Sequence, residues 1–413
     1  MAKREIEGDW VYGWADRKRA TVIAGKDAEG RIINGRAPLV DLEGLLTPTD
    51  AYYIVNQLEV PDPVHPDDWR LEIRGAERNV ILTLEDLRRL PGKTVRAVTE
   101  CAGNDAGYYD YLRTGRNKPS RINQQDMQKR ATARSEGLVP SSEEVGADST
   151  TTCAVSAGEF TGVPLSAVLA LAGVGIDSLC VGARGFDQGR PDPAVIYRSV
   201  GHTQVDIPDR GIVNYEKALP MSKALDPDTL LVWAQNGEYL LHIHGGPVRL
   251  VVPGWSANWW VKWIERLDIL DHMPSLFYQH DYFILAESAG DPQTQSITAM
   301  GVRCVITEPL DEDSPLARGP HMVRGRAWSG MGAICRVEVS FDEGQTWIDA
   351  HLEEPREKWM WCRWSLLWQA DQPGSHRIMA RATDDADRVQ PQIPWNFQRK
   401  LFDGIVPTDV VIE

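Results

Sequence analysis

The hydrophobic and polar positions of this chain change character near residue 290. Before that point, short apolar runs with strand spacing alternate with short helical runs. LEIRG (71–75) and NVILT (79–83) alternate apolar and polar residues and predict two strands. Thr83-Leu84-Glu85-Asp86 predicts a short helix with a capping box, ended by Pro91-Gly92. This alternation is typical of a mixed α+β domain.

Two later segments extend the same pattern. FTGVPLSAVLALAGV (160–174) predicts a turn that enters a short apolar helix, which Gly173 ends. LLVWAQNGEYLL (230–241) predicts a hairpin with Asn236-Gly237 as its turn, because this dipeptide adopts the left-handed conformations that tight hairpins need. We therefore expect a mixed α+β domain rather than a doubly wound sheet.

After about residue 290 the helical patterns disappear. CRVEVSFDEGQTW, WMWCRWSLLWQA and HRIMARATDDADRVQP read as short alternating strands between turn signals, which predicts an immunoglobulin-like β-sandwich. The chain has 15 tryptophans, and several lie in this last third, where they fit the aromatic core of a sandwich.

These patterns divide the 413 residues into parts. Residues 1–50 are predicted to form an N-terminal arm, 51–290 the mixed α+β domain and 291–413 the sandwich. Within the middle part, 106–152 is a long polar stretch, which fits a lid, an insertion that binds a partner, or a solvated loop.

Charge and cysteine usage narrow the classes of function. The net charge of −15 argues against a nucleic-acid or anionic-membrane partner. No apolar stretch is long enough to cross a bilayer and no leader is recognised, so a soluble, cytoplasmic protein is expected. The 6 cysteines include no C-x-x-C pair and no C-x-x-C-H haem motif, so neither a disulfide framework, a zinc site nor a haem is expected.

One cysteine follows a predicted strand. In VRAVTECAGN (95–104) the strand ends at Cys101, and Ala102, Gly103 and Asn104 form a turn. This places a thiol at a strand end. A buried cysteine that packs as a small hydrophobic residue is the alternative interpretation.

A second stretch gathers positive charge in this acidic protein. HGGPVRLVVPGWSANWWVKWI (244–264) brings His244, Arg249 and Lys262 around a strand and a glycine-rich turn. Three such groups fit an anion such as a phosphate, while a solvated surface with one ion pair is the alternative. His242 and His244 could also face one side of a strand as a metal pair, but no third ligand lies nearby in the sequence.

Together these segments resemble the sulfite oxidase family of molybdopterin-dependent oxidoreductases. The resemblance rests on Cys101 in ECAGN, Asp187 in RGFD, HGGPVRLVVPGW followed by VKW, and on GRAWSG, VEVSFDEGQTW and RATDDADRVQP in the sandwich. It runs from about Tyr52 to the end of the chain. It implies a sulfite oxidase-type mixed α+β molybdopterin domain followed by an immunoglobulin-like dimerisation domain.

The resemblance implies a molybdenum-molybdopterin cofactor with Cys101 as the thiolate on the metal. Such a soft ligand suits a metal already held by sulfur. It also implies cofactor-binding roles for the following residues: Tyr53, Ile54, Val55, Asn56, Gln57, Asp187, His244, Arg249, Trp260, Val261 and Lys262.

The substrate positions depart from the sulfite oxidases. Val55 and Ala106 stand where that family has arginines, and Trp233 stands where it has a tyrosine. Trp233 is expected to shape the substrate pocket. The loss of two cations disfavours a small dianion such as sulfite, and VWAQNG resembles the sulfane dehydrogenase branch instead. The long polar stretch contains basic residues with three interpretations: they replace the lost cations, they dock a carrier or electron acceptor, or they are simply solvated. These residues are Arg113, Arg116, Lys118, Arg121, Lys129, Arg130 and Arg134.

The function predicted from the resemblance is transfer of an oxygen atom and two electrons on a small substrate, with oxidation of a sulfur compound (sulfite or sulfane sulfur) favoured. A reductase of S-oxides, N-oxides or oxyanions is the alternative on the same fold. A cofactor-free binding protein and a cysteine hydrolase are alternatives from other classes. The implied partners are a separate electron acceptor such as a cytochrome and a second copy of the chain.

Overall fold

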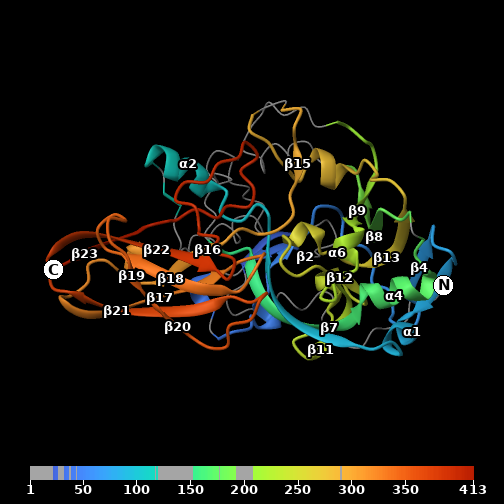
Figure 1. The fold of residues 1–413 in the computed structure, drawn as a ribbon, viewed down its shortest axis with the longest axis horizontal. Helices are drawn as coiled ribbons and strands as arrows, with labels where there is room; N and C mark the ends of the chain where they lie inside the picture. The colour runs from blue at the N-terminus through green and yellow to red at the C-terminus, as the bar shows by residue number, and fades with distance from the viewer. Residues whose placement is uncertain are drawn as a thin grey trace.

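The computed structural model describes residues 22–26, 32–36, 39–42, 44–116, 118–119, 152–175, 177–191, 208–288 and 291–413. These residues form two units that lie side by side, a mixed α+β unit and a β-sandwich (Figure 1). In Figure 1 the sandwich is orange to red at the left, and the α+β unit fills the right half.

One five-stranded sheet of the α+β unit carries the strand before Cys101. Its strand order is β11-β10-β7-β6, with β12 paired to β10, and all neighbours are antiparallel. The ladder between β6 and β7 ends where Glu100 pairs with Val155, so Cys101 lies just beyond it. The strands are β6 (Lys93–Glu100), β7 (Val155–Pro164), β10 (Leu230–Gln235), β11 (Glu238–Tyr239) and β12 (Arg249–Val251).

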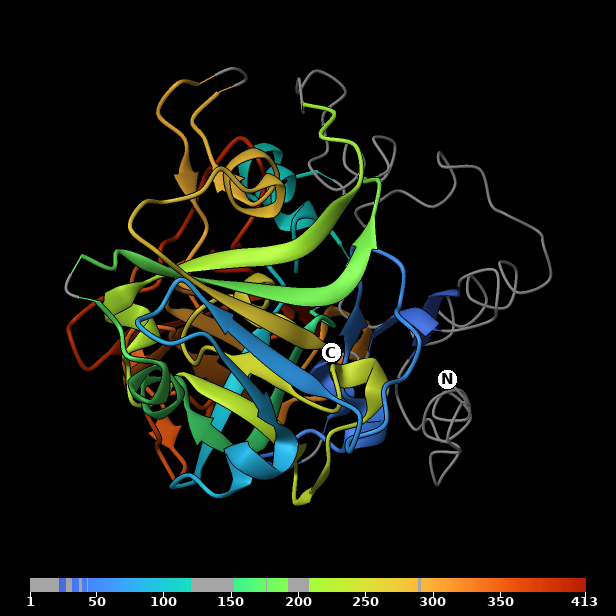
Figure 2. The same ribbon diagram turned by 90° about the vertical axis from the view of Figure 1, so that its right-hand side faces the viewer.

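A second sheet has the order β5-β4-β13-β8-β9 and contains one parallel pair, β13 with β4. Figure 2 shows its long strands β8 and β9 in green to lime. The strands are β4 (Arg70–Arg74), β5 (Val80–Thr83), β8 (Cys180–Gly189), β9 (Val213–Pro220) and β13 (Ile264–Leu270). Three short helices belong to this unit, α1 (Leu84–Arg88), α4 (Leu165–Ala172) and α6 (Met221–Ala224).

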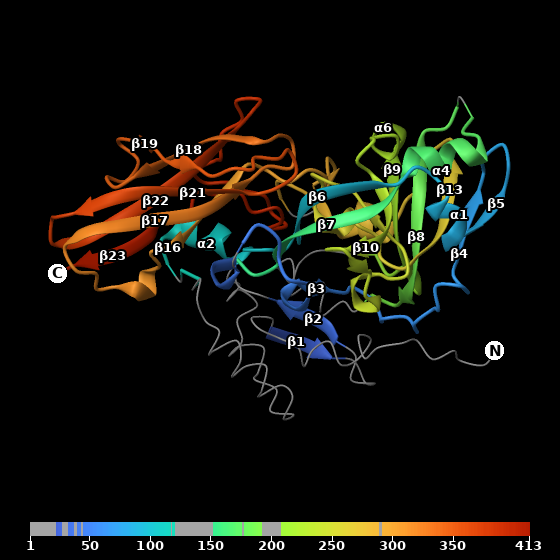
Figure 3. The same ribbon diagram turned by 90° about the horizontal axis from the view of Figure 1, so that it is seen from below.

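Shorter elements complete the unit. The sheet β1-β2-β3 lies below the junction of the two units in Figure 3, and β14 pairs with β15. These strands are β1 (Val22–Lys26), β2 (Ile32–Arg36), β3 (Ile54–Val55), β14 (Ile284–Leu285) and β15 (Gln295–Ser296). Single turns are η2 (Leu39–Asp41), η3 (Thr49–Ala51), η4 (His242–His244), η5 (Ala257–Trp259) and the π-helical η6 (Phe277–Asp281).

The sandwich consists of two four-stranded antiparallel sheets, β16-β17-β21-β20 and β19-β18-β22-β23. Val323, Val337, Trp364 and Ile378 are buried in the core that the two sheets enclose. The elements are β16 (Arg303–Glu308), η7 (Asp311–Asp313), β17 (Gly319–Trp328), β18 (Ile334–Ser340), β19 (Ile348–Asp349), β20 (His351–Leu352), β21 (Cys362–Ala370), β22 (Gly374–Asp384) and β23 (Thr408–Ile412). The predicted α+β unit with an immunoglobulin-like sandwich is confirmed.

The two units share buried contacts. Val98 of β6 belongs to one apolar cluster with Leu39, Met300, Trp328 and Trp361. The end of β6 therefore packs against residues of the sandwich. The boundary predicted between residues 290 and 291 falls inside the β14–β15 pair, and the sandwich strands begin at Arg303.

Several local predictions are confirmed. Thr83 and Asp86 form the predicted capping box at the start of α1. Gly173 ends α4 with a positive φ of 74°, and β10 pairs with β11 across Asn236-Gly237.

Two predictions of local conformation are wrong. FTGVP is the end of strand β7, not a turn, because its glycine is needed for close strand packing: a Cβ at Gly162 would overlap the carbonyl oxygen of Leu231. His242 and His244 lie on a 3-10 turn rather than on a strand, so the face-sharing argument for a metal pair does not apply. Among the described residues, no group of His, Cys, Asp and Glu could hold a metal ion by itself.

The long polar stretch begins with a packed helix, which its overall polarity concealed. Helix α2 (Gly107–Thr114) buries Tyr108, Tyr109 and Tyr111 against Phe402. Arg113 lies 3.9 Å from the ring centre of Trp395, and the ammonium of Lys118 bonds Asp311 and Asp409. Arg121, Lys129, Arg130 and Arg134 lie outside the described residues.

In the described part of the chain, none of the helices combines the length and the apolar character that crossing a bilayer demands.

Candidate functional site

A cavity of the α+β unit brings together most of the residues predicted for the site. It is lined by Cys101, by all five residues of Tyr53–Gln57, and by Asp187, His244, Arg249, Trp260 and Lys262. These residues come from the segment around β3, the end of β6, β8 and the region between η4 and β13. The residues quoted from separate stretches of the sequence therefore form one site.

Cys101 occupies the turn that follows β6. Its N–H donates to Ala154 O at 2.9 Å, and its carbonyl accepts from the N–H of Asn104 at 2.9 Å. The side chain is half-buried and lines the cavity. Asp105 has a positive φ of 59°, so this turn is held in a conformation that non-glycine residues rarely adopt.

Arg249 is buried and fixes the backbone on two sides of the cavity. Its guanidinium donates to His244 O and to Trp260 O, both at 2.8 Å. Burial lowers the pKa of Arg249, and the nearby Tyr52 opposes the shift. Arg249 thus connects two backbone segments that line the cavity.

His244 is not a cation in this site. Burial, together with charge repulsion from Lys262 and Arg249, lowers its pKa to about 3. The imidazole is therefore neutral near pH 7, which corrects the expectation of three positive groups. Its ring packs edge-on against Tyr52, with ring centres 5.4 Å apart.

Lys262 and Asp187 are two buried ionisable residues whose pKa values influence each other. The ammonium of Lys262 donates to Asn56 Oδ1 and to Ile243 O, the latter at 3.3 Å. Burial lowers the pKa of Lys262 and raises the pKa of Asp187, and each residue opposes the shift of the other. Gly245, with a φ of 104°, makes room for Lys262, because a Cβ there would lie 2.9 Å from Lys262 Cβ.

Unsatisfied polar atoms test whether these residues fit a molybdopterin. Among the described residues, four buried side chains at the cavity carry polar atoms without a hydrogen-bond partner: Tyr53 (Oη), Asp187 (Oδ1), Arg249 (Nε) and Asn258 (Nδ2 and Oδ1). Buried polar groups are normally paired, so these atoms suit a polar ligand. Amide, carboxyl and phenol groups match a pterin edge, cations match a phosphate and a thiol matches a soft metal. The residues therefore fit the cofactor.

Several cavity residues were not predicted. Tyr52 directly precedes the predicted Tyr53, and Asn258 lies inside the quoted stretch 244–264, so their place in the sequence was the available signal. Tyr52 Oη lies 2.7 Å from Thr99 Oγ1, and Tyr215 Oη donates to Asn258 O at 2.7 Å. Thr99 lies inside the quoted stretch VRAVTECAGN, whereas Tyr215 and Phe283 belong to no quoted motif and only the fold places them at the cavity.

Three predicted residues do not line this cavity. Trp233 is half-buried on β10 and packs against the main core. Val261 is fully buried, and its carbonyl accepts from the N–H of Leu250 at 2.8 Å. Ala106 precedes helix α2. A substrate role for Trp233 and Ala106 stays a prediction.

A lysine from the end of the chain was also missed. Lys400 is 2% exposed, and a Cβ placed on Gly103 would lie 3.7 Å from its Nζ. Burial lowers the pKa of Lys400 to about 8, while Cys101 raises it. The segment that carries Lys400 bonds the cysteine turn directly, because the N–H of Leu401 donates to Ala102 O at 2.8 Å.

The fold and this site define a protein with a polar cavity that fits a cofactor, and comparison with known families identifies it. Residues 57–278 match the oxidoreductase molybdopterin binding domain, and residues 294–402 match the Mo-co oxidoreductase dimerisation domain. The chain belongs to the sulfite oxidase family of molybdopterin-binding oxidoreductases.

Individual relatives span more than one activity. Mitochondrial sulfite oxidase of Homo sapiens is 30% identical over 87% of this chain and 60% of its own length. Nitrate reductase [NADH] 2 of Phaseolus vulgaris is 28% identical over 93% of this chain and 41% of its own length. The sulfane dehydrogenase SoxCD structure from Paracoccus pantotrophus superposes with a TM-score of 0.71 at 25% identity, covering 100% of this chain and 95% of that chain. The chain thus spans about 60% or less of these two curated relatives.

Proposed function

We propose that the protein is a molybdopterin-dependent oxidoreductase that transfers an oxygen atom and two electrons on a small substrate, with oxidation of a sulfur compound as the favoured reaction. The observation that carries this proposal is that Cys101 shares one cavity with Arg249, Lys262 and the unpaired polar atoms of Asn258. A cavity lined by a thiol together with polar and cationic groups suits a metal-dithiolene cofactor with a phosphate tail.

Each part of the cavity has its own task in this proposal. The bound cofactor supplies the redox change and the oxygen atom. Cys101 would hold the metal, while Arg249 and Lys262 would bind the phosphate by charge-assisted hydrogen bonds. The neutral His244 would donate or accept a hydrogen bond without adding charge. Tyr53, Asp187 and Asn258 would meet the polar edges of the pterin.

The substrate class is argued from charge. Val55 is an uncharged side chain in the cavity at a position where the resemblance predicts an arginine in sulfite oxidases. A small dianion would lose a charge-assisted contact there, worth about 1.5–3 kcal/mol. The structural likeness to a sulfane dehydrogenase supports sulfane sulfur, carried by a larger molecule, as the first substrate to test.

Reduction of an oxyanion is the second candidate. The nitrate reductases support it, because one of them matches 93% of this chain at 28% identity. The proposal also includes electron transfer to or from a separate protein such as a cytochrome. It further includes assembly as a homodimer, which the match to the dimerisation domain supports.

An anaerobic titration of molybdenum-loaded protein tests the substrate. The oxidised protein is titrated with sulfite, thiosulfate and a peptide carrying a cysteine persulfide, and the dithionite-reduced protein is titrated with nitrate and dimethyl sulfoxide. The Mo(V) signal and the products are followed. The variant Cys335→Ser serves as control, because it changes an exposed cysteine that donates only to backbone carbonyls.

Reduction by the persulfide peptide, with sulfite ineffective, is the expected result. Efficient reduction by sulfite would show that other groups replace the missing cations. Reoxidation by nitrate alone would favour the reductase. A loaded, dithionite-reducible protein that responds to none of these compounds would contradict the proposed reaction.

A further inference from the structure

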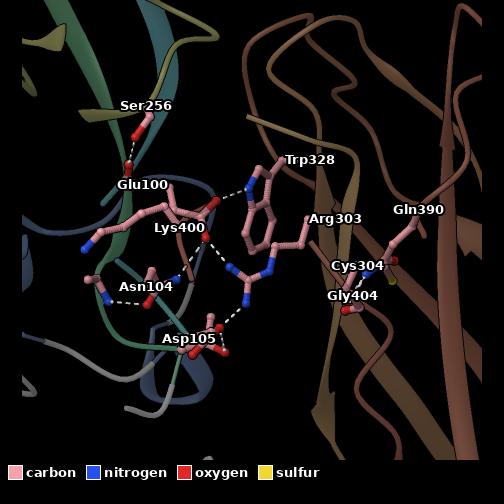
Figure 4. Close-up of polar contacts among 12 residues, drawn as sticks. Glu100, Asn104, Asp105, Ser256, Arg303, Cys304, Trp328, Gln390, Lys400 and Gly404 are labelled. Carbon is pink, nitrogen blue, oxygen red and sulfur yellow. Dashed lines mark hydrogen bonds and ion pairs between the residues drawn. The ribbon is translucent and has the colours of Figure 1, made fainter. Parts of the chain in front are cut away.

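The sandwich reaches the cysteine turn through one buried arginine. Arg303 is the first residue of β16, and its side chain is 3% exposed. Its guanidinium forms ion pairs with the carboxylates of Glu100 and Asp105, as Figure 4 shows. Both partners belong to the α+β unit and are themselves buried.

The two acidic residues bracket Cys101 in the sequence, with Glu100 just before it and Asp105 four positions after it. Asn104 closes the loop between them, because its Nδ2 donates to Glu100 Oε1 at 2.9 Å. The Oδ1 of Asn104 accepts from the N–H of Ala154 at 3.2 Å. Glu100 and Asp105 are therefore tied directly to Arg303, and Asn104 is tied to it through Glu100.

Further contacts fix the orientation of these carboxylates. Trp328 Nε1 donates to Glu100 Oε2 at 2.9 Å, and Arg303 lies 5.3 Å from the Trp328 ring centre (Figure 4). On the other side, Thr152 Oγ1 donates to Asp105 Oδ2 at 2.7 Å. A guanidinium presents its donors in a rigid plane, so the two ion pairs of Arg303 fix the orientation of both carboxylates as well as balancing their charge.

Stability alone gives little reason for this arrangement. Taking two carboxylates and a guanidinium out of water costs free energy that their mutual attraction only roughly offsets, and apolar residues of similar volume often serve as well. What a buried network of this kind adds is one defined geometry. The group held in that geometry here is the turn that carries Cys101.

We propose that Arg303 is a positioning residue for Cys101, through which the sandwich sets the orientation of the thiolate toward the cofactor. This inference rests on the proposed function, because the thiolate is assigned there to the metal. It makes the sandwich a part of the active site and not only a surface for assembly. Mutation of a residue that positions a metal ligand commonly lowers metal affinity or activity by about 10–100-fold.

Three variants test the proposal on the full chain. Arg303→Lys keeps the charge but cannot form both ion pairs in one plane. The triple variant Glu100→Gln/Asp105→Asn/Arg303→Met removes the charges of the three ion-paired residues together. Arg326→Met is the matched control, because Arg326 is a buried arginine at the same interface that bonds Leu42 O and lies over Trp361, away from the cysteine turn.

Two readouts separate positioning from a structural role. The first is the Mo(V) spectrum of the loaded enzyme, whose g values respond to the orientation of the thiolate. The second is hydrogen exchange over residues 98–105 in cofactor-free protein. We expect shifted g values, faster exchange over this segment and about ten-fold or greater loss of turnover in Arg303→Lys and the triple variant, with all three unchanged in Arg326→Met.

Native spectra and native exchange in folded Arg303→Lys and triple variants would overturn the proposal. If these variants fail to fold, Trp328→Phe removes the hydrogen bond to Glu100 while keeping an aromatic ring beside Arg303. It should shift the same signals in the same direction, whereas no shift would contradict the proposal. Wild-type protein that takes up no molybdenum would refute the proposed function alone, because exchange over residues 98–105 would still show whether Arg303 orders the turn.

Discussion

At the scale of single residues, the cavity holds two buried cations beside a neutral histidine. Burial lowers the pKa of Arg249 and of Lys262, and the nearby Tyr52 and Asp187, respectively, oppose these shifts. Lys262 and Arg249 both repel a proton from His244. Near pH 7 His244 is therefore neutral and contributes hydrogen bonding rather than charge.

The neutrality of His244 has a consequence for stability. Its folded pKa of about 3 lies below the ordinary value of 6.5, so below pH 6.5 the unfolded chain takes up a proton that the folded protein does not. The contribution of this group to stability is thus complete above pH 6.5 and is lost as the pH falls toward 3. Between pH 6.5 and about 5 the loss is about 2 kcal/mol.

Urea unfolding of cofactor-free protein at several pH values measures this loss. We expect His244→Gln to lose less stability than the wild type as the pH falls, with the curve of the exposed His351→Gln control parallel to the wild type. Parallel curves for wild type and His244→Gln would show that His244 titrates alike in both states.

The residues of the site were predictable where they stand inside short motifs. Cys101, Arg249 and Lys262 belong to stretches whose composition differs from that of the rest of the chain, and all three line the cavity. Tyr215 and Phe283 reach the same cavity from β9 and from beyond η6, where no local pattern marks them. Their place in the cavity depends on strand pairing between distant segments, which cannot be predicted from local sequence patterns.

At the scale of elements, the alternation of apolar and polar residues predicted the strands well. The error at FTGVP has a physical reason, since a glycine inside a strand usually indicates a turn but here allows β7 and β10 to approach closely. The helix α2 was missed because its tyrosines, although polar in part, pack as an apolar face against Phe402.

Gly162→Ala tests this account of β7. The added Cβ would overlap the carbonyl oxygen of Leu231, so the β7–β10 pair must shift, and we expect the free energy of unfolding to fall by about 1–3 kcal/mol. Gly175→Ala is the control, because its Cβ would meet its nearest neighbour, Ser178 Oγ, at an ordinary 3.8 Å. Equal thermal unfolding midpoints for the two variants would contradict the packing argument.

At the scale of the whole molecule, the two units are joined by more than a linker. Val98 and Trp328 share one apolar cluster, Arg303 bonds both sides of the cysteine turn, and the N–H of Leu401 donates to Ala102 O. The order of the two units could be predicted from the sequence, but this buried junction could not, because its residues are spread from Leu39 to Leu401.

The match to a dimerisation domain predicts the assembly state. We expect light scattering after size-exclusion chromatography to give twice the mass of one chain, because the family model covers residues 294–402 of the sandwich. A concentration-independent single-chain mass would contradict this expectation without affecting the cofactor site.

X-ray absorption at the molybdenum edge tests directly whether Cys101 is the protein ligand of a molybdenum cofactor in the cavity. Spectra are compared for the wild type and for Cys101→Ser, with Cys335→Ser as control. We expect one sulfur neighbour fewer around the metal in Cys101→Ser and no change in the control. An unchanged number of sulfur neighbours in Cys101→Ser, or wild-type protein that binds no molybdenum, would contradict it.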